Sequence, residues 1–179
     1  MKRVTVFCAS SDRIPDVYKQ DAHEMGKLLA EAGYGLVYGG GALGTMGIVA
    51  DEMLKAGAPV KGVIPRFMVE VEWQHKGVAD MELTDTMSER KQRLIEAGDI
   101  VLVLAGGVGT LDEMFEAISD RKLDLNDKAM VVLNTAGLYT PIRDMMERLN
   151  AEGFLRDNDH LYFADTPREA IEKIDSILG

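Results

Sequence analysis

Short apolar runs alternate with longer amphipathic segments along the whole chain, and this alternation constrains the fold more than any other feature. Brief apolar runs are typical of buried strands, and the segments between them carry apolar residues at helical spacing. Strands that alternate with helices predict an α/β protein with a Rossmann-like three-layer αβα fold and a mostly parallel central sheet. The predicted strands are residues 4–9, 35–38, 60–64, 100–104, 130–133 and 161–163, and the predicted helices are residues 17–32, 46–56, 87–97, 110–122, 138–150 and 167–177.

Glycine and proline residues stand where the predicted helices should end and begin. Gly33, Gly57 and Gly98 follow helical segments, and Pro15 and Pro167 precede them, as expected from the preference of Gly for helix ends and of Pro for helix starts. A length of 179 residues favours one domain with a sizeable core. Because the sequence contains no repeat or interdomain linker, we expect a single Rossmann-like nucleotide-binding domain over residues 1–179.

Charge and cysteine content restrict the partners and the compartment. The formal net charge is −10 and the sequence pI is about 4.8, which disfavours binding to a nucleic-acid backbone. Cys8 is the only cysteine, so an intramolecular disulfide is impossible and a reducing compartment is expected. The apolar run near the N-terminus is too short for a signal peptide, and no stretch approaches the ~18 apolar residues of a membrane span. We therefore expect a cytoplasmic protein with no nucleic-acid or membrane partner.

The segment of residues 65–84 is the least regular part of the sequence. It carries Glu70, Glu72, Trp73 and His75 without a clear period. One interpretation is a simple excursion over the surface of the protein. The other is a loop that closes over a binding site, since long loops in compact domains are often functional.

A glycine-rich turn follows the predicted strand at residues 100–104. Residues 105–113 read Ala-Gly-Gly-Val-Gly-Thr-Leu-Asp-Glu, so the strand leads through glycines into a helix that opens with Thr110. Glycines allow a backbone to approach an anion closely, and the free N–H groups of a helix start favour phosphate. Glu113 stands about one helical turn further on. The segment thus predicts a phosphate-binding turn beside a carboxylate, as chemistry on a phosphorylated sugar requires.

A second glycine cluster follows the predicted strand at residues 35–38. Gly39, Gly41 and Gly44 satisfy the dinucleotide-binding pattern G-x-G-x-x-G. The cluster follows the second strand rather than the first, however, and no acid after the next strand is placed to hold a ribose hydroxyl, which argues against a dehydrogenase. The glycines could simply permit a tight turn. Because parallel strands end at one edge of the sheet, we expect both glycine turns to face the same site.

The residues from Thr110 to Glu113 also have a purely structural interpretation. A Ser/Thr-x-x-Glu sequence is a capping box, in which the two side chains satisfy N–H groups at a helix start. Glu116 and Asp120 share a helix face with Glu113, and a ligand rich in hydroxyls or nearby arginines would offset their mutual repulsion. A plain solvated acidic face is the alternative.

Cations and histidines give weaker signals. Arg90 and Lys91, near the start of the helix at residues 87–97, either belong to a solvated face or contact a phosphate, a ribose or the carboxylates. His23, His75 and His160 are far apart in the sequence and lack the spacing of a metal site. We therefore expect no metal and no cofactor.

Three motifs together resemble the Lonely Guy family of cytokinin riboside 5′-monophosphate phosphoribohydrolases, often mislabelled as lysine decarboxylases. Residues 39–47 resemble the family segment G-G-G-x-x-G-x-M-G, residues 87–91 resemble M-x-x-R-K, and residues 105–113 resemble P-G-G-x-G-T-x-x-E. The likeness extends over essentially the whole chain. Two positions depart from it, because Ala105 replaces the motif proline and Ser88 stands where many members have histidine.

This resemblance implies a Rossmann-like enzyme, usually a homodimer, that hydrolyses the N-glycosidic bond of a nucleoside 5′-monophosphate. AMP or cytokinin riboside 5′-monophosphate would yield the free base and ribose 5-phosphate. Glu113 and Arg90 would be catalytic, with Glu113 stabilising an oxocarbenium-like ribosyl cation or activating the attacking water. The implied substrate-binding residues are Lys91, Gly106, Gly107, Gly109, Thr110, Glu72, Gly40, Gly41, Met87 and Glu116.

Two other functions remain open at this point. A non-catalytic carrier of a nucleotide or pterin cofactor would need the phosphate-binding turn but not the pair of Glu113 and Arg90. A lysine decarboxylase would need a lysine that binds pyridoxal phosphate, and the sequence assigns none.

Overall fold

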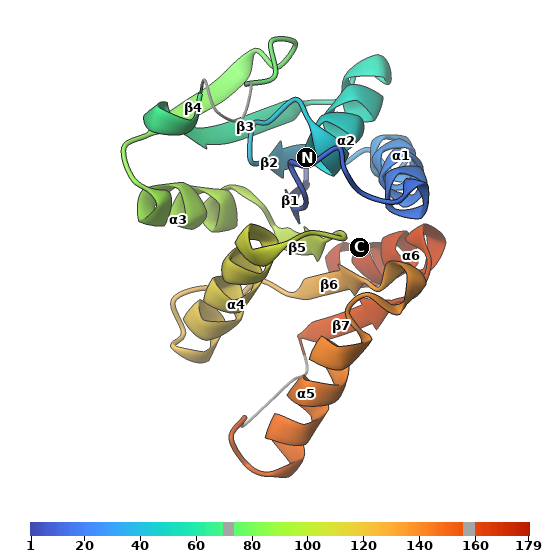
Figure 1. Cartoon of the computed structure of the whole chain (residues 1–179), viewed down its shortest axis with the longest axis vertical. Helices are drawn as coiled ribbons and strands as arrows, with labels where there is room; N and C mark the ends of the chain where they lie inside the picture. The colour runs from blue at the N-terminus through green and yellow to red at the C-terminus, as the bar shows by residue number, and fades with distance from the viewer. Residues whose placement is uncertain (70–73, 156–159) are drawn as a thin grey trace.

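The strands form one parallel sheet at the centre of the molecule. The structure, a computed structural model, describes residues 1–69, 74–155 and 160–179. The sheet has seven strands in the order β4-β3-β2-β1-β5-β6-β7, and all of its neighbouring strands run parallel (Figure 1). The strands are β1 (Arg3–Phe7), β2 (Gly35–Tyr38), β3 (Val60–Pro65), β4 (Asp80–Thr84), β5 (Ile100–Val103), β6 (Met130–Leu133) and β7 (Leu161–Ala164).

Helices cover both faces of this sheet. One core cluster joins it to α1, α2 and α6, and a second joins it to α3, α4 and the start of α5. Within the described residues, no helix is long and apolar enough to cross a membrane. The helices are α1 (Asp16–Glu31), α2 (Gly44–Lys55), α3 (Met87–Ala97), α4 (Val108–Lys122), α5 (Thr140–Ala151) and α6 (Pro167–Leu178).

The central strands are apolar on both faces because both faces are covered. In β1, Val4 and Val6 pack into the cluster of α1, α2 and α6, whereas Phe7 packs into the opposite cluster. Thr5 is also fully buried, and its hydroxyl donates to the Leu94 carbonyl oxygen at 2.7 Å. Near-continuous apolar runs of this kind are expected in parallel sheets.

Successive strands join the sheet on one side of β1 up to β4 and on its other side from β5 onward, so the strand order reverses between β1 and β5. Strands β2, β3 and β4 extend the sheet on one side of β1, and β5, β6 and β7 extend it on the other. In register, Val6 lies opposite Tyr38 of β2, and Phe7 lies opposite Val103 of β5. The glycine turns after β2 and β5 therefore leave the same edge, where parallel α/β sheets bind ligands.

The predicted fold class is confirmed, and the six predicted strands are present with small shifts at their ends. The prediction missed β4, which lies within the segment described above as irregular. This strand reads Asp-Met-Glu-Leu-Thr and occupies one edge of the sheet, so it has no continuous apolar run to reveal it. Part of the same segment, residues 70–73, lies outside the described residues, and the idea of a closing loop stays a prediction.

Candidate active site

Arg90 connects three elements at the carboxyl edge of the sheet. It belongs to the first turn of α3 and is only 3% exposed. Its Nε donates to the Val63 carbonyl oxygen of β3 at 3.1 Å. Its Nη2 donates to the Gly39 carbonyl oxygen after β2, and its Nη1 donates to Glu113 Oε1 of α4, each at 3.1 Å. The guanidinium group is thus fixed in one position by groups far apart in the sequence.

The pair of Arg90 and Glu113 is buried and depends on the glycine beside it. Glu113 is 5% exposed, so its negative charge lies away from water and needs the positive charge of Arg90 as compensation. A Cβ atom at Gly39 would collide with the Arg90 guanidinium. Two residues predicted from separate motifs, Arg90 and Glu113, therefore lie side by side, together with the first glycine of the second cluster.

The capping-box interpretation of Thr110 and Glu113 is wrong for this helix. α4 begins at Val108, two residues before the predicted start, with Gly107 as its N-cap and no side-chain cap. Thr110 is thus inside the first turn and buried. Glu113 does not cap the helix but reaches Arg90. On the acidic face, Glu113 thus has an arginine partner, whereas Glu116 pairs with Lys91.

The amides at the start of α4 are open. No residue of the described chain accepts a hydrogen bond from the amides of Val108, Gly109 or Thr110. A Cβ atom at Gly107 or Gly109 would meet nothing within 4 Å, whereas one at Gly106 would collide with the Thr110 side chain. These N–H groups, at the positive end of the helix dipole, can bind an anion such as phosphate.

Lys91 forms the outer part of the same arrangement. Its Nζ pairs with Asp112 Oδ2 at 3.0 Å and with the carboxylate of Glu116. The hydrogen bond with Glu116 is the main cause that raises the pKa of Lys91, and Asp112 adds to it. The structure thus brings Lys91 of α3 into contact with Glu116 of α4, beside the buried pair of Arg90 and Glu113.

The remaining predicted contacts lie around this centre. Gly40 and Gly41 are buried, and the Gly40 carbonyl oxygen accepts from the His75 amide at 3.0 Å. Met87 is the first residue of α3 and is half-buried. Glu72 lies outside the described residues, so its predicted contact with substrate stays a prediction.

The sequence did not point to Tyr139, which holds the glycine turn in place. Tyr139 precedes α5 and is 2% exposed, and its hydroxyl donates to the Leu104 carbonyl oxygen at 2.9 Å. Burial raises the pKa of the Tyr139 phenol, and a hydrogen bond with the Gly106 backbone partly offsets that rise. A lone tyrosine before a predicted helix gives no signal for this contact across two strands.

Cys8 lies beside the buried pair of Arg90 and Glu113, but its thiol is unreactive at neutral pH. Burial raises the pKa of its thiol to about 12, and the charge of Glu113 adds to the rise. Only the thiolate is a good nucleophile. Cys8 is therefore a packing residue at neutral pH.

Two of the histidines contact neighbouring acids of α2, and the third lies at another part of the molecule. His23 contacts Glu52 at 3.0 Å and His75 contacts Asp51 at 3.2 Å, while His160 lines a cavity elsewhere. No group of three His, Cys, Asp or Glu that could hold a metal ion occurs in residues 1–69, 74–155 and 160–179.

The fold and this edge define a Rossmann-like α/β protein with an open anion-binding turn beside a buried carboxylate–guanidinium pair. The family model described as "Possible lysine decarboxylase" matches residues 46–174. A probable cytokinin riboside 5′-monophosphate phosphoribohydrolase, LOGL2 of Oryza sativa subsp. japonica, is 36% identical over 97% of this chain and 72% of that protein. The cytokinin riboside 5′-monophosphate phosphoribohydrolase of Rhodococcoides fascians is 37% identical over 86% of this chain and 78% of that protein. The chain therefore belongs to the LOG family.

Solved structures support the fold. The molybdenum cofactor carrier protein of Chlamydomonas reinhardtii superposes with a TM-score of 0.77 at 21% identity, over 99% of both chains. The molybdenum cofactor binding protein of Rippkaea orientalis gives a TM-score of 0.75 at 20% identity, over 100% of this chain and 99% of that chain. At these identities the likeness concerns the fold alone.

Proposed function

We propose that this protein hydrolyses the N-glycosidic bond of a nucleoside 5′-monophosphate, with AMP or cytokinin riboside 5′-monophosphate as substrate. The buried contact of 3.1 Å between Arg90 and Glu113, beside the open amides of α4, is the observation that carries the proposal. The names of the similar LOG proteins support the same reaction.

The 5′-phosphate binds at the turn of Gly106, Gly107, Gly109 and Thr110. Backbone amides at the start of α4 donate to its oxygens. Binding energy from this remote group holds the ribose against Glu113, which lowers the entropic barrier to reaction.

Glu113 acts on the bond itself. As the bond between C1′ and the base nitrogen breaks, its electron pair leaves with the base and positive charge develops on the ribose ring. The carboxylate stabilises that charge and accepts a proton from the attacking water, whose oxygen bonds to C1′. The proton passes to the departing base, so the products are the neutral base and ribose 5-phosphate.

Arg90 positions the carboxylate for this step. Hydrogen bonds to Val63, Gly39 and Glu113 hold the guanidinium in position, and its charge compensates that of the buried Glu113. A carboxylate held in this way needs little reorganisation when the ribosyl cation forms.

The test is chromatography of AMP and of N6-isopentenyl-AMP after incubation with the protein. We expect release of the free base together with ribose 5-phosphate. Glu113→Gln should lower the rate of base release by about 10²-fold or more. Calorimetry should show that the variant still binds AMP. Unchanged turnover in Glu113→Gln would contradict the assignment.

A carrier of a nucleotide or pterin cofactor is the second candidate. The fold likeness to molybdenum cofactor carriers is compatible with it. A carrier has no need of a buried pair such as Arg90 and Glu113 beside the anion-binding turn. Binding of AMP by the wild-type protein without any release of base would favour the carrier.

The description of the family model suggests a decarboxylase, and Lys91 argues against that activity. A lysine that forms a Schiff base needs a lowered pKa. The pKa of Lys91 is instead raised by Glu116 and Asp112. We therefore expect no imine between added pyridoxal phosphate and Lys91, as mass spectrometry of the borohydride-reduced protein would show.

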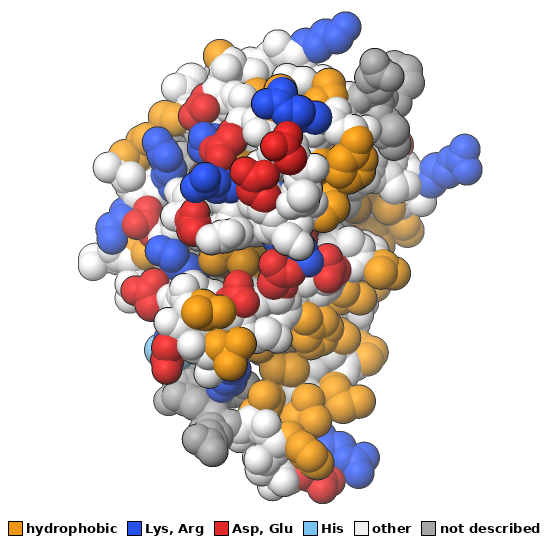
Figure 2. All heavy atoms as spheres, turned by 90° about the vertical axis from the view of Figure 1, so that its left-hand side faces the viewer, with side chains coloured by type: hydrophobic (Ala, Val, Ile, Leu, Met, Phe, Trp, Pro, Cys, Tyr) orange, Lys and Arg blue, Asp and Glu red, His pale blue; other side chains and the backbone are white. Residues whose placement is uncertain are grey.

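A homodimer, expected from the resemblance, is part of the proposal. Val108 and Phe115 of α4, Leu138 before α5 and Met145 within α5 are exposed large apolar residues. Figure 2 shows apolar side chains gathered on one part of the surface. A second copy would remove them from water. Light scattering after gel filtration should give twice the monomer mass, and a monomer would contradict it.

A further inference from the structure

A cavity opens at the amino edge of the sheet, opposite the glycine turns. Its volume is about 610 Å³, within the range of small-molecule sites. Arg121 and Lys122 at the end of α4 line one side, and Met130 and Leu161, the first residues of β6 and β7, line another. The cavity thus lies at the carboxyl end of α4, whereas the glycine turn lies at its amino end (Figure 1).

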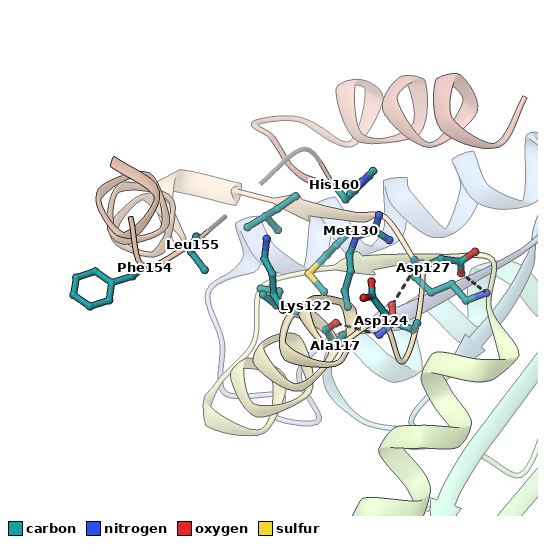
Figure 3. A pocket seen from close by; sticks show the side chains of 13 residues that line it. Ala117, Lys122, Asp124, Asp127, Met130, Phe154, Leu155 and His160 are labelled. Atoms are coloured by element: carbon teal, nitrogen blue, oxygen red, sulfur yellow. Dashed lines mark hydrogen bonds and ion pairs between the residues drawn. The ribbon is translucent and has the colours of Figure 1, made fainter. Parts of the chain in front are cut away.

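The lining combines an apolar interior with cationic side chains. Ile118, Met130, Leu155 and Leu161 supply apolar surface. In Figure 3 the Lys122 side chain rises from α4 between the labelled Leu155 and Met130. The interior thus offers an apolar surface beside a positive charge.

Among the described residues that line the cavity, the charges leave an excess of positive charge. Lys128 pairs with the exposed Asp127 at 3.7 Å, so these two largely cancel. Arg121 and Lys122 then face only Asp124 among the lining residues. A local positive excess stands out on a protein whose net charge is −10.

Arg121 also has an unused buried donor. Its Nη1 is buried and finds no hydrogen-bond acceptor among the described residues. A guanidinium group stays charged at all accessible pH values, and a buried donor without an acceptor is unfavourable. A planar carboxylate or a phosphate is the acceptor that arginine matches best.

The wall next to Arg121 is held in a fixed shape. Asn126 Nδ2 donates to the Ala117 carbonyl oxygen at 3.2 Å, and Asn126 Oδ1 accepts from the Lys128 amide at 3.0 Å. These bonds tie the loop after α4 to the helix (Figure 3). A preformed wall lowers the entropy lost on binding.

We propose that this cavity binds a small organic anion, with a phosphate or carboxylate head at Arg121 and Lys122 and an apolar body against Met130 and Leu161. The site is separate from the one proposed for nucleotide hydrolysis. Binding is measured without turnover, so the two proposals stand or fall independently.

The experiment is NMR of the full chain with methyl-labelled methionine, titrated with phenyl phosphate and, separately, with phenylacetate. We expect a saturable shift of the Met130 methyl signal with at least one of the two, and the one that binds identifies the head group. Arg121→Gln should weaken this binding at least about tenfold, because it removes a charge-assisted hydrogen bond. Arg168→Gln, on α6 and outside the lining, changes the net charge equally and should leave the dissociation constant unchanged.

Two results would overturn the proposal. The first is the absence of a saturable Met130 shift with either compound up to about 10 mM, a concentration that detects even weak binding. The second is binding to Arg121→Gln as tight as to wild type. If Arg121→Gln does not fold, Lys122→Gln, which changes an exposed side chain, replaces it and should weaken binding by a smaller factor.

Discussion

The two glycine turns at the carboxyl edge have similar sequences and different structures. After β2, the turn leads into α2, whose first amides are already used. The Gly44 amide donates to Asp12 Oδ1 at 2.7 Å, and the Met46 amide donates to the Ala9 carbonyl oxygen at 3.1 Å. This turn is closed by the loop that follows β1.

After β5, the turn leads into α4, whose first amides have no such partners in the described chain. Val108, an apolar residue at this helix start, is 83% exposed. The difference shows that glycine content and a helix start do not by themselves make an anion site. What matters is whether another part of the chain already occupies the amides.

Arg90 links the two turns, because it contacts the Gly39 carbonyl oxygen after β2 and Glu113 of α4. Replacement of Arg90 should therefore have the largest effect on stability and activity. Arg90→Met removes the guanidinium that compensates the charge of the buried Glu113, and it frees the carbonyl oxygens of Val63 and Gly39. We expect a loss of about 3–5 kcal/mol in the free energy of unfolding, measured by urea denaturation, together with loss of base release. The double variant Arg90→Met with Glu113→Leu should recover most of the stability and none of the activity. A stable single variant would contradict the role of the pair.

One substitution made in each turn sharpens the comparison. Gly39→Ala places a methyl group against the Arg90 guanidinium and should destabilise the protein by about 1–3 kcal/mol. Gly109→Ala enters open space and should leave the stability unchanged or raise it by up to about 1 kcal/mol. Thermal unfolding measures both. Equal destabilisation by the two substitutions would mean that the turns do not differ as described.

Much of this edge follows from the sequence. The alternation of apolar and amphipathic segments fixed the class of fold, because parallel strands covered on both faces need continuous apolar runs. Arg90 and Glu113 could be proposed as partners, since their motifs flank the same central strand. The edge strand β4 could not be found, because its exposed residues break the apolar run.

Other features depend on contacts that no local pattern encodes. The amide of Gly44 in the turn after β2 is occupied by Asp12, which lies 32 residues earlier in the chain. α4 starts at Val108 instead of Thr110, and Glu113 pairs with Arg90, a residue of another helix, instead of capping its own. Tyr139 reaches the open turn from another element.

Tyr139→Phe tests whether the Tyr139 hydroxyl, which bonds to Leu104, holds the turn after β5 in position. The substitution keeps the ring and removes the hydroxyl bond to the Leu104 carbonyl oxygen. We expect a loss of about 1 kcal/mol in stability and a higher KM for AMP with little change in kcat, because the phosphate site loosens and the carboxylate does not move. Tyr162→Phe, at a partly buried tyrosine of β7, is the matched control and should leave KM unchanged. A fall in kcat alone would place Tyr139 outside the phosphate site.

The smallest expected effect concerns the ion pairs of Lys91 on the outer side of the open turn. Glu116 and Asp112 raise the pKa of Lys91 above its ordinary value of 10.5, so the folded state binds this proton more tightly than the unfolded chain. The stability that these pairs contribute, about 1 kcal/mol or less, is therefore complete below pH 10.5 and is lost as the pH rises through the folded pKa. The difference in unfolding free energy between wild type and Lys91→Met should be constant from neutral pH to about pH 10 and then shrink. Lys76→Met, at an exposed lysine, should show no such dependence. A difference that grows with pH would reverse the sign and refute the assignment of these ion pairs.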